Sequence, residues 1–181
     1  MDKVGTSFRL IAPIRPSGHS ILWGRMGFEI ERKFLVTSET WRDMATRSER
    51  LRDGLLARFT DGKIRIRRSE DRATITIKSS RIGMRRSEYE YEICCTDAEE
   101  IMTTLCEGRL MEKTRYFVPH DGLTWVVDVY EGALAGLVIA EIELERENQT
   151  FSLPSWVGRE VTGDPRFRKG SLQSNPLPKP D

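Results

Sequence analysis

The chain has 181 residues, a length that fits one domain able to bury a core without disulfide or metal staples. Charged residues make up 31% of the chain, yet the formal net charge is only +1, so basic and acidic side chains are nearly balanced. This balance argues against a nucleic-acid partner, because nucleic-acid binders carry a clear basic excess. The longest apolar run, residues 133–140, is too short to cross a bilayer, so no membrane partner is expected.

Cysteine usage indicates the compartment. The chain has three cysteines, Cys94, Cys95 and Cys106, an odd number without metal-ligand spacing. A disulfide framework is therefore not expected, and a reducing, cytoplasmic location is the simpler interpretation.

The two ends differ in composition from the rest of the chain. Residues 1–25 contain several Pro and Gly residues and lack the apolar core of a signal peptide. We expect either that Met26 is the natural start and residues 1–25 are not native, or that residues 1–25 are a disordered extension. The domain is predicted over residues 26–172, and the Pro-rich residues 173–181 are predicted to be a disordered tail.

Strand patterns dominate the domain in chain order. Residues 28–36 alternate between apolar and charged side chains, as a half-buried strand does. The sequence therefore predicts a mainly β, α+β fold with seven or eight strands, mostly antiparallel and in hairpin order. The later strands are expected as a hairpin over residues 61–80 and as single strands over 85–94, 111–118, 123–132 and 136–147.

Two helices are expected to cover the sheet. The first is predicted over residues 37–56, where Thr37 or Ser38 can cap a segment rich in Arg and Glu. The second is predicted over residues 96–108, because Thr96 and Glu99 have capping-box spacing.

Charged side chains recur on one face of almost every predicted strand, and they are segregated by strand. Glu29, Glu31 and Lys33 share a face of the first strand. Other strands present Lys-x-Arg-x-Arg, Arg-x-Glu-x-Glu-x-Glu, Lys-x-Arg or Glu-x-Glu-x-Glu. A solvated outer face would mix charged and neutral polar residues along each strand. If the sheet closes into a barrel, these faces converge and place basic groups opposite carboxylates.

This segregation suits a polyanion together with a divalent metal ion. Lys and Arg pair with phosphate oxygens, and grouped Glu carboxylates are hard ligands that suit Mg²⁺ or Mn²⁺. A metal ion that bridges carboxylates and phosphates polarises phosphorus for attack by water. No Ser/His/Asp nucleophile set is needed, and none is visible in the sequence.

The ordered motifs resemble those of a known family. "EIERKFLV" resembles the N-terminal signature of the CYTH superfamily, the triphosphate tunnel metalloenzymes. The similarity continues in order over residues 26–172 through "KIRIRR", "ATITIK", "RRSEYEYEI", "EKTRY", "WVVDVYEG", "GLVIAEIELE" and "GREVTGDPRF". It implies an eight-stranded antiparallel β-barrel that forms a tunnel with a charged interior and helices outside. The outer positions under the helices would be Phe28, Ile30, Ile64, Ile66, Tyr89, Tyr91 and Ile142.

The resemblance also implies an activity and a set of site residues. Small bacterial members are similar to inorganic triphosphatases that use Mg²⁺ or Mn²⁺, so metal-dependent hydrolysis of triphosphate is expected. A thiamine triphosphatase, a cyclase that converts ATP to cyclic AMP and a non-catalytic polyphosphate sensor are the alternatives. By matching position, the metal ligands would be Glu29, Glu31, Glu141 and Glu143, and the triphosphate would be held by Lys33, Arg65, Arg67, Lys78, Lys113 and Arg115. Lys33, Glu88, Glu90 and Lys113 would be catalytic, with Asp128 as a further inward candidate.

The sequence departs from the family in two places. Leu55 stands in "DGLL" where relatives often have Tyr in Gln-Gly-Tyr-Leu, so the preference for triphosphate is open. Near the C-terminus, "FRKGSL" replaces a Tyr-Asn-Ser run, and Arg168 and Lys169 either add positive charge at a tunnel mouth or are solvated. Glu92, Glu145 and Lys63 are expected to be solvated or paired at strand ends, and a homodimer is possible.

Overall fold

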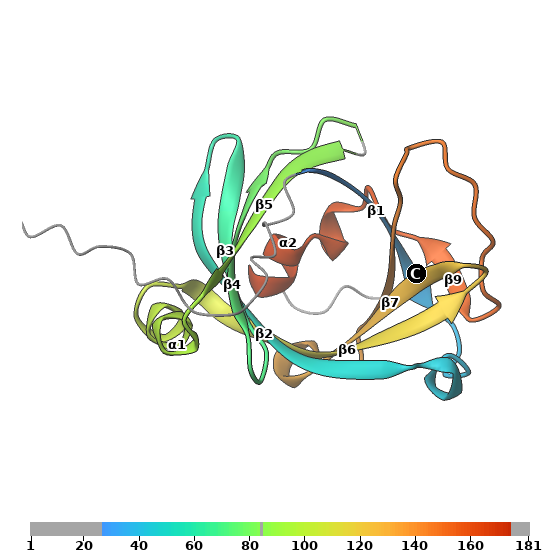
Figure 1. Cartoon of the computed structure of the whole chain (residues 1–181), viewed down its shortest axis with the longest axis horizontal. Helices are drawn as coiled ribbons and strands as arrows, with labels where there is room; N and C mark the ends of the chain where they lie inside the picture. Colours follow the sequence, from blue (N-terminus) through green and yellow to red (C-terminus); the bar gives the residue numbers. More distant parts are fainter. Residues whose placement is uncertain (1–26, 84, 175–181) are drawn as a thin grey trace, which may run out of the picture.

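The computed structural model describes residues 27–83 and 85–174 of the chain (Figure 1). The expectations for residues 1–25 and for Met26 lie outside this part. The predicted tail overlaps the end of the last helix, which runs to Ser174, and its remainder also lies outside the described residues.

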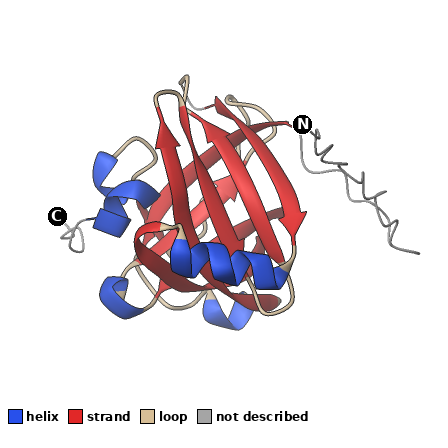
Figure 2. Ribbon diagram, turned by 90° about the vertical axis from the view of Figure 1, so that its left-hand side faces the viewer, coloured by secondary structure: helices blue, strands red, loops and turns tan. Residues whose placement is uncertain are grey.

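The strands form one antiparallel sheet that closes into a ring (Figures 1 and 2). The sheet order is β5-β4-β3-β2-β6-β7-β8-β1-β9, and an additional pairing of β1 with β5 closes the ring of eight strands. This confirms the expected fold class, and β9 is an extra strand at the second half of β1. The strands are β1 (Gly27–Val36), β2 (Arg47–Phe59), β3 (Gly62–Arg68), β4 (Ala73–Ser79), β5 (Arg85–Ile93), β6 (Glu107–His120), β7 (Leu123–Tyr130), β8 (Val138–Glu143) and β9 (Val157–Glu160).

Helices are short and few in the described part of the chain. The α-helices are α1 (Cys95–Thr104) and α2 (Lys169–Ser174), and the 3-10 helices are η1 (Arg42–Met44), η2 (Gly132–Leu134) and η3 (Pro165–Phe167). Helix α1 lies across the outer face of the sheet in Figure 2, where Ala98 and Met102 pack with Ile66 and Ala73. Helix α2 lies at the centre of the ring in Figure 1 and toward one end of it in Figure 2. No described helix combines the length and apolar character that a membrane span needs, and the cytoplasmic location stays a prediction.

The helix predicted over residues 37–56 is wrong. Only the three residues of η1 are helical there, and β2 occupies the second half of the segment. Tertiary pairing overrides the helical preference of the Arg- and Glu-rich sequence, because β2 pairs with β3 on one side and with β6 on the other. Gly54 allows a close approach within this arrangement, because a Cβ there would lie 2.6 Å from the Cys106 Sγ and would force a neighbour to shift.

The outer surface of the ring is covered only in part as expected. Ile30, Ile66 and Ile142 are buried as expected, and Ile64 is half-buried. Phe28, Tyr89 and Tyr91 are 66%, 39% and 48% exposed, so the expectation that helices cover them is wrong. The outer face of β1, β6, β7 and β8 is instead covered by a cluster that includes Trp41, Trp125 and Trp156.

Candidate active site

The interior of the ring is charged, as the alternation predicts. Strand β1 directs Glu29, Glu31 and Lys33 inward. Successive side chains of a strand point to opposite faces, and Phe34, next to Lys33, packs in the outer core. Strands β3 and β4 contribute basic side chains, β5 contributes both acidic and basic ones, and β6, β7 and β8 contribute the remainder. The inward charged side chains that contact one another include Arg65, Arg67, Lys78, Arg86, Glu88, Lys113, Arg115, Asp128 and Glu141.

Two cavities penetrate the ring. The larger one, of about 1040 Å³, is mainly basic, with Arg58, Lys63, Arg81 and Arg168 among its lining residues. The smaller one, of about 380 Å³, is lined by most of the predicted site, including the acidic Glu29, Glu31, Glu88, Glu90, Glu141 and Glu143. The larger cavity is therefore mainly basic, whereas carboxylates and cations such as Arg65 and Arg115 line the smaller one together.

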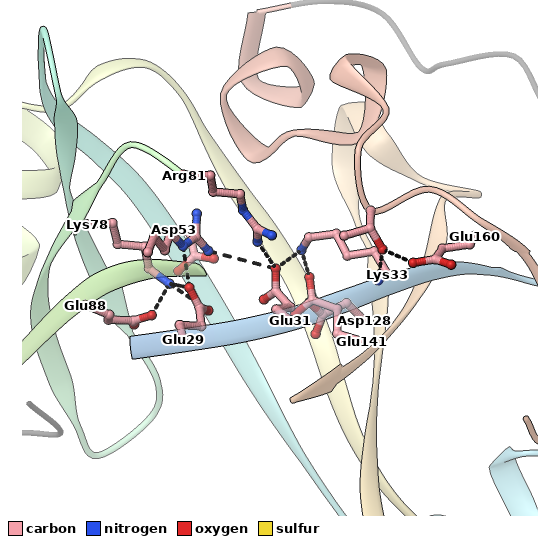
Figure 3. Close-up of polar contacts among 12 residues, drawn as sticks. Glu29, Glu31, Lys33, Asp53, Lys78, Arg81, Glu88, Asp128, Glu141 and Glu160 are labelled. Atoms are coloured by element: carbon pink, nitrogen blue, oxygen red, sulfur yellow. Dashed lines mark hydrogen bonds and ion pairs between the residues drawn. The ribbon is translucent and has the colours of Figure 1, made fainter. Parts of the chain in front are cut away.

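Lys33 lies between two carboxylates (Figure 3). Its Nζ is 2.9 Å from Glu31 Oε1 and also contacts Glu141 Oε1, which comes from the adjacent strand β8. Burial alone would lower the pKa of Lys33, but Glu141 and Glu31 outweigh burial and raise this pKa. Lys33 is therefore charged, and it holds Glu31 and Glu141 close to each other.

Glu29 lies in a second cluster at the start of β1. Lys78 Nζ lies 3.2 Å from Glu29 Oε1 and 2.6 Å from Glu88 Oε2, and Arg86 also donates to Glu29. Burial opposes ionisation of Glu29, but Lys78 and Arg86 together lower its pKa below the ordinary value. Burial raises the pKa of Glu88, which makes Glu88 the better proton acceptor of the two.

A wall of cations faces these carboxylates. Arg67 donates to Asp53 through Nε at 2.8 Å and Nη2 at 3.1 Å, and Arg115 donates to Asp128 through Nε at 2.8 Å and Nη2 at 2.9 Å. Lys113 contacts Asp128 and lies 3.9 Å from Asp53. Asp53 and Asp128 therefore act as counter-ions that hold the cations in place.

Burial lowers the pKa of several interior lysines, among them Lys63 and Lys113. Burial, assisted by Arg86, Arg65 and Lys78, lowers the pKa of Lys63 to about 7. Burial and Arg115 lower the pKa of Lys113 to about 8, although Asp128 and Asp53 oppose this shift. Lys63 was expected to be solvated or paired, but it lines the larger cavity and has no carboxylate within 4 Å among the described residues.

Direct cross-strand neighbours include pairs of like charge. Glu31 lies opposite Glu143 between β1 and β8, and Lys63 lies opposite Lys78 between β3 and β4. Like charges directly opposite each other destabilise a sheet. Their presence indicates that the interior is shaped for a charged ligand.

Comparison with known protein families gives a match over nearly all of the described residues. A model of the CYTH domain family matches residues 27–171. The chain belongs to the CYTH domain family.

Relatives of this CYTH chain have a named activity. An inorganic triphosphatase of Acetivibrio thermocellus is 44% identical over 151 residues, which are 83% of this chain and 96% of the relative. An inorganic triphosphatase of Nitrosomonas europaea is 40% identical over 149 residues, 80% of this chain and 95% of the relative.

Solved structures show the same fold. A crystal structure of an inorganic triphosphatase superposes with a TM-score of 0.62 at 36% identity, covering 83% of this chain and 100% of that chain. A putative adenylyl cyclase from Hippeastrum, described as having dominant triphosphatase activity, superposes with a TM-score of 0.52 at 15% identity, covering 65% of this chain and 80% of that chain. The second likeness shows the fold alone.

The CYTH interior brings together most of the predicted site residues. Glu90 accepts a hydrogen bond of 3.1 Å from Thr76 Oγ1 and lies beside the smaller cavity. Glu143 lines the same cavity but is exposed at the end of β8. Outside the cavities, Glu92 is exposed with Arg72 3.5 Å away, and Glu145 is exposed beyond β8, in keeping with the interpretation of both as solvated or paired.

Three interior residues were missed from the sequence. Asp53 was assigned to the helix that does not form, although Leu51, Asp53 and Leu55 lie two residues apart and share one buried face of the strand. Arg86 was recognised on the charged face of its strand but was given no role, and it donates to Glu29. Arg81 lies in the turn after β4 and donates to Glu31 at 3.1 Å (Figure 3), and no pattern in the sequence identifies it.

The carboxylates fit a hard divalent cation in kind. Glu29, Glu31, Glu141 and Glu143 present carboxylate oxygens at one edge of the smaller cavity, and oxygen donors are the ligands that Mg²⁺ and Mn²⁺ prefer. Glu29, Glu31 and Glu141 contact Lys33, Lys78, Arg81, Arg86 or Arg115 instead of one another. Within residues 27–83 and 85–174, accordingly, no three acidic, His or Cys side chains are already gathered as a metal site.

Proposed function

We propose that this chain hydrolyses inorganic triphosphate to pyrophosphate and phosphate inside the ring, with Mg²⁺ or Mn²⁺ as cofactor. The observation that supports this most is the arrangement of the interior, where a wall of Arg and Lys faces a group of Glu carboxylates. A triphosphate offers several charged oxygens to the basic wall, and the acidic group offers oxygen ligands for the accompanying metal ion.

Arg65 has donors ready for phosphate. Its Nε and Nη1 are buried, and among the described residues neither donates a hydrogen bond. A buried donor without an acceptor is costly, and a phosphate oxygen would satisfy both donors of the guanidinium. We assign Arg65 to substrate binding together with Lys33, Arg67, Lys78, Lys113 and Arg115.

Glu29, Glu31, Glu141 and Glu143 would hold the metal ion, which would neutralise phosphate charge and polarise the terminal phosphorus. Water attacks the terminal phosphorus, and the bond from this phosphorus to the bridging oxygen breaks. Glu88 and Glu90 orient the water, and Glu88 Oε2 accepts its proton, because burial raises the pKa of Glu88. Lys33 and Lys113 stabilise the negative charge that develops on the departing pyrophosphate.

A second candidate substrate is an organic triphosphate. The larger cavity is lined by Phe59 and Phe167 in addition to its basic residues, so it offers apolar surface to a nucleoside or a thiamine group. A cyclase or a thiamine triphosphatase would use this space. The inorganic substrate is preferred because the two curated relatives at 40–44% identity are named inorganic triphosphatases.

The proposal is tested by phosphate release from inorganic triphosphate, ATP, thiamine triphosphate and pyrophosphate, each with Mg²⁺, Mn²⁺ or EDTA. Release from inorganic triphosphate that exceeds release from the other substrates and disappears in EDTA supports the proposal. Release only from an organic triphosphate overturns the substrate assignment. Tight triphosphate binding without release from any substrate would identify a receptor.

A further inference from the structure

Lys169 occupies a special position in the interior. It is the first residue of α2, and among the described residues it alone lines both the larger and the smaller cavity. The alternative that Lys169 is merely solvated outside the tunnel therefore does not hold. A ligand that extends from one cavity into the other passes this side chain.

The helix is fixed by apolar packing on the same side as Lys169. Leu172 is 1% exposed and packs with Phe167, Met111 and Tyr130. Residues three apart on a helix share one face, so packing of Leu172 directs Lys169 toward the interior. Gly170 also lets the Arg58 guanidinium lie close to the backbone of α2, because a Cβ at Gly170 would lie 2.5 Å from Arg58 Nη2.

Lys169 is half-buried and lies among other cations. No carboxylate lies within 4 Å of its ammonium group in the described part of the chain, and it makes no hydrogen bond there. Burial and the charges of Lys113, Arg65 and Lys33 lower its pKa, while Glu141 acts in the opposite direction. Lys33 and Lys113 each have a carboxylate partner, whereas Lys169 has none.

An ammonium group without a partner among like charges costs free energy in the empty protein. A polyanion bound at this position would remove that cost by providing acceptor oxygens. We propose that Lys169 is a further substrate contact that binds a phosphate of the triphosphate where the two cavities meet, and that it sets the affinity for substrate. This inference rests on the proposed function.

The test compares Lys169→Met and Lys169→Arg with the wild-type chain in triphosphate hydrolysis. Lys169→Met is expected to raise KM by about 10- to 100-fold with little change in kcat, as expected for loss of one hydrogen bond to a charged group. Lys169→Arg keeps the charge and is expected to recover most of the affinity. An unchanged KM in Lys169→Met would overturn the inference.

A matched control removes a nearby cation outside both cavities. Arg166 lies in η3 and forms an ion pair with Asp164 at 2.8 Å, so Arg166→Met is expected to keep the wild-type KM. Thermal unfolding without substrate separates binding from a structural role. Lys169→Met is expected to match or exceed the wild-type Tm, because it removes an unpartnered charge. A lower Tm together with an equal loss of kcat in both Lys169 variants would overturn the inference in favour of a structural role.

Calorimetry with triphosphate in EDTA distinguishes failure of this inference from failure of the proposed function. Triphosphate binding by the wild type that is unchanged in Lys169→Met overturns the role of Lys169 alone. A wild-type chain that neither binds nor hydrolyses triphosphate overturns both. Weaker binding in Lys169→Met than in the wild type and in Arg166→Met supports the inference.

Discussion

Asp53 on β2 accepts two hydrogen bonds from the Arg67 guanidinium on β3, at 2.8 and 3.1 Å, in the interior of the ring. Arg65 and Lys113 lie 3.8 and 3.9 Å from the same carboxylate. Asp53 thus offsets part of the repulsion among three neighbouring cations. These three are among the six cations assigned to the triphosphate, so Asp53 and the substrate compete for them.

Asp53→Asn is expected to destabilise the free protein and to increase the gain in Tm on addition of triphosphate. Removing one partner of a buried charge cluster costs roughly 3–5 kcal/mol, because the remaining charges are uncompensated. Triphosphate supplies the missing negative charge, so its addition in EDTA should raise the Tm of the variant more than that of the wild type. The control is Glu99→Gln, which breaks the half-exposed Arg52–Glu99 pair and should cost less than about 1 kcal/mol. An equal Tm gain in Asp53→Asn and the wild type would contradict the counter-ion role.

Glu29→Gln tests the acidic group. The amide keeps the shape of the side chain but is a poor ligand for a hard cation, so turnover should fall by about 100-fold or more. The metal concentration needed for half-maximal activity should rise as well, which is measured by titration with Mg²⁺ or Mn²⁺. Glu92→Gln is the matched control, because Glu92 is exposed at the end of β5 and should keep normal activity. Normal turnover in Glu29→Gln would remove Glu29 from the site.

The lowered pKa of Lys63 predicts that stability depends on pH. Its pKa is about 7 in the folded protein and about 10.4 in an unfolded chain, so the unfolded state binds more protons between these values. The free energy of unfolding should therefore rise with pH from about 7 to 10, and Lys63→Met should lose this part of the increase. Thermal unfolding of both proteins across this range is the measurement. Parallel Tm curves for the two proteins would show that Lys63 has an ordinary pKa.

Metal removal should abolish activity without unfolding the protein. Lys33, Lys78, Arg81 and Arg86 already neutralise the carboxylates of Glu29 and Glu31 in the absence of metal. The folded state therefore does not depend on a cation, unlike a structural metal site. The Tm measured in EDTA should stay close to that of the untreated protein, and added Mg²⁺ should restore turnover. A large fall of Tm in EDTA would indicate a structural metal.

The sequence predicted the charged faces of the strands better than it predicted strand β2. Alternation in β1 and β3 correctly separated Glu29, Glu31, Lys33 and Arg65 from the apolar outer residues, because a strand has a strict period of two. The same period in β2 was hidden by Arg and Glu, which also favour helices. Ladder pairing with two neighbours decided the outcome, and local preference does not encode it.

The C-terminal segment shows the second limit of prediction. The run "FRKGSL" left Lys169 undecided between a tunnel mouth and solvent. Packing of Leu172 against the core directs Lys169 inward, and such a contact between distant parts of the chain has no local pattern. Phe28 and Tyr91 are also exposed, although the sequence placed both under helices, and the period of a strand does not say what covers its outer face. The homodimer that the sequence analysis left open is not tested by this exposure.

The central claim is most directly tested by following inorganic triphosphate with ³¹P NMR in the presence of the purified chain and Mg²⁺ or Mn²⁺. The account predicts that triphosphate disappears while orthophosphate and pyrophosphate form in equal amounts, and that EDTA stops the reaction. Triphosphate that persists both with Mg²⁺ and with Mn²⁺, under conditions in which the chain is folded, would contradict the account.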